Sequence, residues 1–294
     1  MKQADDFLLE SQALDKLVTP LTEIELTQVT GFKSWTFEAI LRHLHFWNRM
    51  ADLALTAPDD FQKALKPAVD AMMAGKTLPE IELEHFSETG LSLVALWRSG
   101  YQSVAAAYLQ ADVSQRVAWV GPSMSARSAI TARQMETWAH GQAIADELSV
   151  QREEADRIHN IVILGVNTFG WSFTVRGEAD PETPPFVSLL SPSGERGEFG
   201  SPDSDQRISG QAHEFAQVVT QTRNIQDTQL EYEGAIAEDW MHHAQCFAGV
   251  ASEPPAPGAR RIKYCGRQGA RLEASLIALG LCLETPAPVD SPFV

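Results

Sequence analysis

Apolar residues in the first half of the chain recur every three or four positions, which is the spacing of one face of an α-helix. This pattern predicts six helical stretches, at residues 5–26, 34–50, 57–75, 79–109, 125–148 and 156–171. Gly90 and Gly100 interrupt the fourth stretch and weaken the prediction there. Long helices joined by loops are typical of an up-and-down bundle, whose core can host a metal on facing helices.

The pattern changes after Gly170, where apolar and polar residues begin to alternate as in β-strands. The alternation predicts strands at 172–176, 186–190, 194–199 and 229–234, while helical spacing continues at 208–223, 235–247 and 270–281. We therefore expect an α+β protein with three parts. These are a four-helix-type bundle in residues 1–170, a small α+β domain in 171–252, and a Pro-rich linker and tail with one helix in 253–294.

Composition narrows the function classes. The formal net charge is -16, which argues against nucleic acid or an anionic membrane surface as a partner. The three cysteines form no zinc or redox pair by spacing, so a reducing, cytoplasmic compartment fits best. The start of the chain does not resemble a signal peptide, and the apolar run 161–166 is too short to cross a bilayer. We expect a small-molecule substrate and leave a homodimer open.

Candidate metal ligands lie on two of the predicted helices. Glu136 and His140 are four residues apart, so a helix places them on one face. His43 lies among apolar positions of an earlier helix. Two histidines and one glutamate would leave a coordination position free, as in metals that handle a substrate. The alternative is that these side chains only form surface pairs or hydrogen bonds within the core.

Nearby polar residues fit ordinary roles. Arg133 lies one turn before Glu136, and we expect it to form a surface ion pair rather than to reach a pocket. His45 falls on a different helix face from His43, and we expect it to be exposed. Cys246 lies on an apolar helix and is interpreted as a packed small residue.

The ligand pattern resembles the DinB-like bundle of the mycothiol-dependent maleylpyruvate isomerase family. In that family a tryptophan precedes the first histidine by eight residues, as Trp35 precedes His43, and a later Glu-x-x-x-His pair matches Glu136 and His140. One departure is Ser34, which stands where the family has glycine before the tryptophan.

The resemblance covers roughly residues 5–250 and is greatest to an uncharacterised metal-binding branch. Segments 199–203, 207–212 and 232–240 resemble a small C-terminal domain of actinobacterial relatives. Similar segments in other proteins carry a family label that refers to wyosine base formation in tRNA. The net charge of -16 argues against a direct role of this protein on tRNA.

The resemblance implies a chemistry. His43, Glu136 and His140 would hold zinc, with nickel or ferrous iron as alternatives. The metal would activate a low-molecular-weight thiol such as mycothiol, bacillithiol or glutathione for an isomerase or S-transferase. A small, electrophilic and anionic substrate would then lie between bundle and α+β unit, held by Arg223. The alternative reading of Arg223 is a cation that stabilises a helix C-terminus. The alternative function is a non-catalytic metal-binding or sensing protein.

Overall fold

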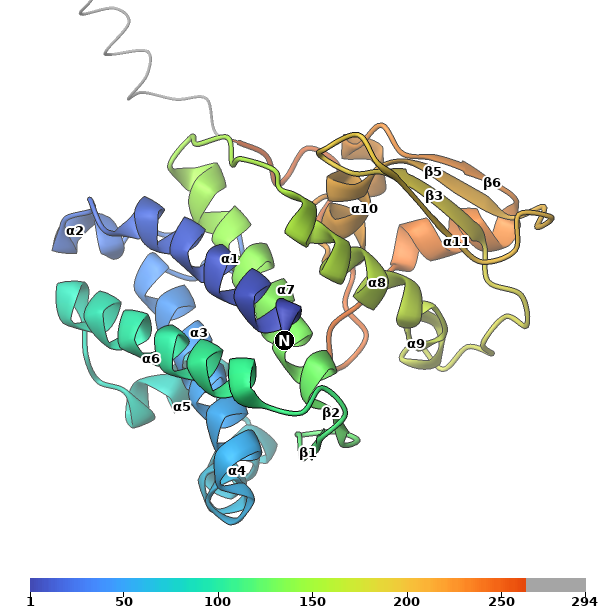
Figure 1. Cartoon of the computed structure of the whole chain (residues 1–294). Helices are drawn as coiled ribbons and strands as arrows, with labels where there is room; N and C mark the ends of the chain where they lie inside the picture. Colours follow the sequence, from blue (N-terminus) through green and yellow to red (C-terminus); the bar gives the residue numbers. More distant parts are fainter. Residues whose placement is uncertain (263–294) are drawn as a thin grey trace, which may run out of the picture.

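The computed structural model describes residues 1–262. Its N-terminal half is a bundle of helices (Figure 1). Its four long helices are α1 (Lys2–Val18), α3 (Phe37–Thr56), α6 (Gly90–Gln110) and α7 (Ala126–Glu147). Each of the four packs against two of the others, since α1 and α3 both contact α6 and α7. The apolar faces predicted from the periodicity thus meet in one core, and the α+β class with its helical bundle is confirmed.

Shorter elements complete the bundle, namely α2 (Glu23–Leu26), α4 (Pro58–Met73), α5 (Leu78–His85) and the small β1 (Arg116–Val117) and β2 (Met124–Ser125). Two predicted long helices are each divided. The first ends before Pro20, which lacks the N–H that would continue it. The stretch predicted at 79–109 breaks between α5 and α6, where Gly90 has a left-handed φ of 55°.

His45 is buried, so its predicted exposure is wrong. The side chain of His45 lies against the backbone of Gly100 in α6, where an added Cβ would come within 2.6 Å of its Nδ1 atom. The imidazole also meets the ring of Phe86 edge-on, with a centroid distance of 4.4 Å. Gly100, which weakened the helix prediction, is therefore the position at which α6 comes close to a side chain of α3.

The C-terminal unit has a four-stranded mixed sheet, formed by β3 (Phe186–Leu190), β4 (Arg196–Phe199), β5 (Arg207–Gln211) and β6 (Glu231–Glu233). The strand order is β4-β3-β5-β6, in which only β3 and β5 are parallel. Helix α10 (Ala212–Val219) packs on β3 and β5 and also on α8 (His159–Asn167). Helix α8 in turn contacts α7 of the bundle. The remaining elements are η1 (Asp156–Ile158), α9 (Phe169–Thr174), η2 (Ile225–Asp227) and α11 (Ala235–His243).

Two predictions for this unit are wrong. Residues 172–176 do not form a strand, because α9 continues to Thr174 and Phe173 packs on Phe169 one helical turn earlier. The helix predicted from residue 208 begins only at Ala212, since the preceding residues pair with β3 as strand β5. The hairpin of β3 and β4 and the strand at β6 are confirmed. The helix predicted at 270–281 lies outside the described residues.

Helix α7 belongs to both halves of the molecule. Ile130 and Ile144 pack in the core of the bundle, whereas Met135 and Trp138 pack with α8 and the C-terminal unit. Buried residues therefore surround this helix on all sides, which makes it the shared element on which a site between the two halves can be built. No helix within residues 1–262 is long and apolar enough to cross a membrane.

Candidate metal centre

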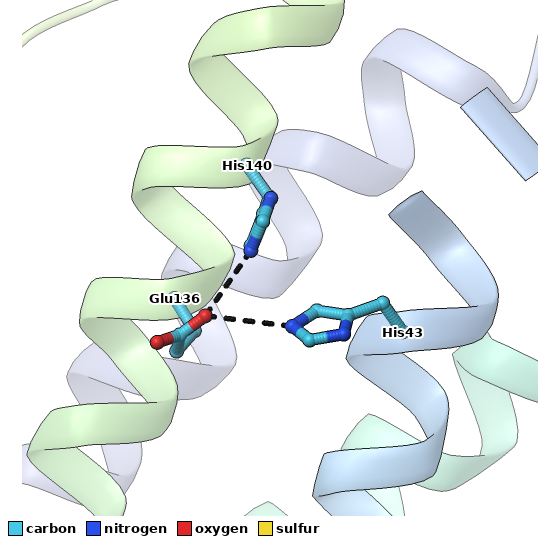
Figure 2. A group of neighbouring side chains, drawn as sticks. All are labelled: His43, Glu136 and His140. Carbon is cyan, nitrogen blue, oxygen red and sulfur yellow. Dashed lines mark hydrogen bonds and ion pairs between the residues drawn. The ribbon is translucent and has the colours of Figure 1, made fainter. Parts of the chain in front are cut away.

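His43, Glu136 and His140 converge in the structure (Figure 2). His43 comes from α3, and the other two side chains project from α7 towards it. The Oε2 atom of Glu136 lies 3.1 Å from Nε2 of His140 and 3.6 Å from Nε2 of His43. Each of the three residues offers one potential ligand atom, and these three atoms all lie within 4.8 Å of one another.

The loop before α3 explains how the two histidines are held. Thr36 caps α3 by accepting a hydrogen bond from the Ala39 N–H at 3.1 Å. The preceding residue, Trp35, lies parallel to the His140 ring with a centroid distance of 5.8 Å. The same indole meets the His43 ring at 5.2 Å. Trp35 therefore contacts both imidazoles and restricts their rotation.

The loop reaches this position through an uncommon backbone conformation. Lys33 and Ser34 have φ values of 48° and 57°, in the left-handed region that favours glycine. The resemblance places a glycine at position 34 in related proteins. The serine here adopts the conformation for which glycine is better suited.

A fourth residue, Glu82 of α5, supports the centre and was not predicted. Its Oε1 atom accepts a hydrogen bond of 2.7 Å from Nδ1 of His43, and the glutamate is fully buried. This bond leaves Nε2 as the histidine atom that faces Glu136. Carboxylates commonly orient metal-binding histidines in this way. The sequence carries no spacing signal for Glu82, because it lies on a separate helix among other acidic residues.

Glu136 and His140 favour the unprotonated form that binds a cation, whereas His43 favours its proton, which a bound metal would have to displace. Burial acts against protonation of His43, but the charges of Glu82 and Glu136 outweigh it and raise the pKa of His43 to about 8. Burial lowers the pKa of His140 to about 4, despite its hydrogen bond with Glu136. Burial also acts to raise the pKa of Glu136, but hydrogen bonds with both histidines hold it well below its usual range. The carboxylate is thus ionised at neutral pH.

Two of the three ligand separations fit a tetrahedral divalent ion, and the third, between the two histidines, is within 4.8 Å. Ligand atoms bound at about 2.0–2.1 Å to one tetrahedral ion lie about 3.3 Å apart. The two separations that involve Glu136, 3.1 and 3.6 Å, lie on either side of this value. With Nδ1 of His43 donating to Glu82, its unprotonated Nε2 would face a carboxylate oxygen, and two lone pairs repel. A proton or a cation between them removes this conflict.

Arg133 is buried, so the expectation of a surface ion pair is wrong. Its side chain is 3% exposed and donates from Nε to Oδ1 of Asn48 at 3.0 Å. Nη2 has no hydrogen-bond partner among the described residues. The position of Arg133 one turn before Glu136 brings its charge next to the centre rather than to the surface.

Arg223 lies beyond the end of α10 and forms a buried ion pair with Asp146 of α7. Its Nη1 and Nη2 atoms donate to the two carboxylate oxygens at 2.8 and 2.6 Å. Its neighbours Gln221 and Thr222 line the pocket described below, whereas Arg223 is not among the described residues that line it. Its predicted contact with a substrate stays a prediction.

A pocket of about 730 Å³ opens onto the three residues. One wall is formed by the bundle, including Trp35, Trp47 and Trp119. The opposite wall comes from the C-terminal unit, through residues 220–222, 247–253, Pro255 and Arg260. Cys246, which precedes this wall, is buried as predicted. The candidate centre is therefore reachable by a small molecule that both halves of the chain would contact.

Comparisons with known proteins identify the family of this chain. The sequence profile of the mycothiol maleylpyruvate isomerase N-terminal domain matches residues 7–145. Uncharacterised proteins from two strains of Mycobacterium tuberculosis are 35% identical over 253 residues, which is 86% of this chain and 96% of theirs.

Two solved structures are also similar, those of mycothiol-dependent maleylpyruvate isomerase and of a mutant of it. They share 13% and 14% sequence identity with this chain, with TM-scores of 0.44 and 0.47, and the match covers 74% of this chain and 87% of theirs. From the domain match and the mycobacterial relatives, the chain belongs to the family of proteins built on the mycothiol maleylpyruvate isomerase N-terminal domain.

Proposed function

We propose that this protein binds a divalent cation through His43, Glu136 and His140 and uses it in a thiol-dependent isomerase or S-transferase reaction. The observation that carries the proposal is the position of the three ligand atoms, mutually within 4.8 Å, on the wall of a pocket of about 730 Å³. A metal that only stabilises a fold is normally enclosed by four protein ligands. Zinc suits two imidazoles and one carboxylate best, with nickel and ferrous iron as alternatives.

The described residues supply the rest of the site. When bound, the cation would lower the pKa of a coordinated thiol and favour its nucleophilic thiolate at neutral pH. Glu82 holds His43 with Nε2 facing the centre, and Trp35 packs against both imidazoles. Trp47 and Trp119 give the pocket an apolar wall, which would exclude water from a thiol and a small electrophile.

The names of the similar proteins support mycothiol as the first thiol to test, since the matching domain and both solved structures are described by it. Bacillithiol and glutathione are the alternatives, because the chemistry requires only a small thiol. We expect the protein to act on a small molecule in the cytoplasm, where such thiols are reduced. A non-catalytic sensor has less support, because its metal would not need a pocket of this size.

Metal analysis of protein purified without an affinity tag tests the site. We expect about one divalent ion per chain in the wild type and a large loss in His43→Ala and Glu136→Ala. His159→Ala is the matched control, because His159 is exposed and distant in sequence from the centre. Wild-type metal content in both site variants would refute the ligand assignment.

Thiol-dependent turnover tests the activity separately. Zinc-loaded protein is mixed with mycothiol, bacillithiol or glutathione and a panel of small electrophiles that includes unsaturated carboxylic acids. The expected result is isomerisation or S-transfer with at least one thiol, lost in Glu136→Ala. Full metal binding without turnover for any thiol would favour the non-catalytic alternative.

A further inference from the structure

The pocket at the candidate metal centre is lined by two chemically different groups of residues. The C-terminal unit contributes hydroxyl and amide groups from Thr220, Gln221, Thr222 and Ser252. Beyond the residues around the candidate ligands, the bundle contributes five apolar side chains, from α3, α4, α5 and the segment between β1 and β2: Trp47, Met72, Leu78, Trp119 and Val120. We call these five residues the apolar subsite. The polar group suits a hydrophilic thiol, whereas the apolar subsite suits a hydrocarbon group.

The apolar subsite is continuous with the candidate metal centre. Trp47 follows His43 by four residues in α3, so the two side chains project from the same helix face. Their ring centroids are 6.3 Å apart. Trp119 extends this row, since its indole lies 5.7 Å from that of Trp47 at an interplanar angle of 51°. A group bound against these indoles would therefore lie next to the candidate ligands.

Buried aromatic rings hold the two indoles in place. Trp119 lies nearly parallel to Phe61 of α4, with centroids 6.1 Å apart and ring planes at 12°. Trp47 meets the ring of Phe46 edge-on at 5.2 Å. Phe61 and Phe46 are 0% and 1% exposed, whereas both indoles are only partly buried and line the pocket. The apolar subsite is thus preformed, which lowers the entropic cost of binding a ligand.

The pocket is larger than one small electrophile requires. A cavity of about 150 Å³ is sufficient for benzene, and the pocket has a volume of about 730 Å³. The pocket extends to the protein surface at Val120, which is 46% exposed. Exposed apolar side chains that continue a pocket are typical of ligand-binding grooves. The pocket therefore has room for a hydrocarbon group in addition to a thiol and a reactive centre.

The side chains of the apolar subsite favour an aromatic group over an aliphatic one. Indole rings attract other flat rings through their quadrupoles, in addition to the gain from buried area. The thioether of Met72 also makes favourable contacts with aromatic rings. We propose that the electrophilic substrate carries a flat aromatic group, which the apolar subsite binds beside the candidate metal ligands. This inference rests on the proposed function for the reaction, but the binding of an aromatic group can be measured without turnover.

The test is calorimetric titration of the zinc-loaded protein with 2-naphthol and with decahydro-2-naphthol, which has the same carbon skeleton but no aromatic face. The wild type should bind 2-naphthol at least about threefold more tightly than the saturated compound. Val120→Glu should weaken 2-naphthol binding roughly tenfold or more, because it brings a charge into the apolar subsite. Val113→Glu is the matched control, since Val113 is 45% exposed and is not among the described residues that line the pocket.

Changes at Trp119 test the aromatic preference itself. Trp119→Leu should keep apolar contact but bind the two compounds with similar affinity, and Trp119→Phe should retain most of the preference. Equal affinity of the wild type for the two compounds, unchanged 2-naphthol binding in Val120→Glu, or equal loss in Val113→Glu would overturn the proposal. A full aromatic preference in Trp119→Leu, or no binding of 2-naphthol by the wild type at about 1 mM, would overturn it as well.

Titrations are repeated after removal of the metal, and the zinc content of each variant is measured. If the proposal holds, 2-naphthol binds the zinc-loaded and the metal-free protein with similar affinity, and Val120→Glu weakens binding in both. If the naphthol oxygen only binds the metal, chelation abolishes binding and Val120→Glu does not, which overturns the apolar subsite without affecting the metal proposal. A wild type that binds no zinc but still binds 2-naphthol in a manner that depends on Val120 would refute only the proposed function.

Discussion

Glu82 accepts a hydrogen bond of 2.7 Å from Nδ1 of His43, across the contact between α5 and α3. The bond fixes which nitrogen of the histidine faces the candidate metal centre. The second carboxylate oxygen of Glu82, Oε2, has no hydrogen-bond partner in the described part of the chain. The buried carboxylate therefore depends on its contact with His43. We regard Glu82 as a positioning residue of the site.

Glu82→Gln is therefore expected to weaken metal binding about 10- to 100-fold while the chain still folds, because the amide keeps the shape of the side chain. The measurement is zinc affinity by competition with a chelating dye. Glu84→Gln on the same helix is the control, since the side chain of Glu84 is 58% exposed and pairs with Lys76. Equal zinc affinities for wild type and Glu82→Gln would show that the contact does not orient the ligand.

Removal of the metal should lower thermal stability. A ligand at a hundredfold excess over its dissociation constant stabilises a folded protein by about 2.7 kcal/mol. For a chain of 294 residues that corresponds to a fall in Tm of roughly 4 °C after chelation. Differential scanning calorimetry with and without zinc measures the shift. In His43→Ala the melting temperature should not respond to zinc, and a response equal to that of the wild type would place the metal elsewhere.

Asp15 is expected to make stability depend on pH. Burial acts to raise its pKa, but hydrogen bonds from Arg98, Tyr101 and Thr19 outweigh burial and lower it below the ordinary value of 3.8. The folded state therefore favours the carboxylate. Its contribution is present above the ordinary pKa and is lost as the pH falls through the lowered one.

Asp15→Asn should accordingly reduce the free energy of unfolding at pH 7 by about 1 kcal/mol, moderated by solvent at the partly exposed Arg98. Urea denaturation from pH 7 down to acidic pH measures the difference, which should shrink as Asp15 becomes protonated. The exposed Asp203→Asn serves as the control. A difference between wild type and Asp15→Asn that is constant with pH would contradict the assignment.

Gly165 of α8 lies directly against α10. An added Cβ would lie 2.9 Å from Cε1 of Phe215 and from Cγ2 of Val219, both in the core of the C-terminal unit. Gly165→Ala should therefore destabilise the protein by about 1–3 kcal/mol, because the two helices must separate. Thermal unfolding compares it with Gly121→Ala, where an added Cβ meets no atom within 4 Å. If both variants unfold at the same temperature, the contact of α8 with α10 at Gly165 can accommodate a methyl group and the prediction is wrong.

Ser34 should be improved by glycine. Its φ of 57° is in the left-handed region, which disfavours residues with a Cβ. Ser34→Gly is expected to raise the free energy of unfolding by about 0.5–1 kcal/mol, after allowance for the greater freedom of glycine in the unfolded chain. Ser34→Ala keeps the Cβ and should show no such gain. Chemical denaturation at neutral pH distinguishes the two variants.

The convergence of the three candidate ligands could be predicted because helical spacing and the Trp35–His43 interval are local properties of the sequence. Glu136 and His140 needed only a continuous helix to share a face, and α7 provides it. Strands β3 and β4 were predictable for a similar reason, since their hairpin turns at Gly194 with a φ of 90°. Local signals thus determine the helices that meet at the centre.

Three of the wrong predictions concern partners that are distant in the sequence. His45 is buried because Gly100, 55 positions later, leaves room for its ring. Arg133 turns inward because Asn48 of α3 accepts its hydrogen bond. Residues 207–211 form a strand because β3 offers a parallel edge, which outweighs their helical spacing. Sequence periodicity does not report any of these contacts.

The C-terminal unit forms one wall of the pocket, while all three candidate ligands come from the bundle. Exchange of that wall alone would alter which molecules the pocket admits without changing any of the three candidate ligands. Changes confined to the second half of the chain would thereby alter selectivity for small molecules while the cation-binding geometry of the first half stays the same.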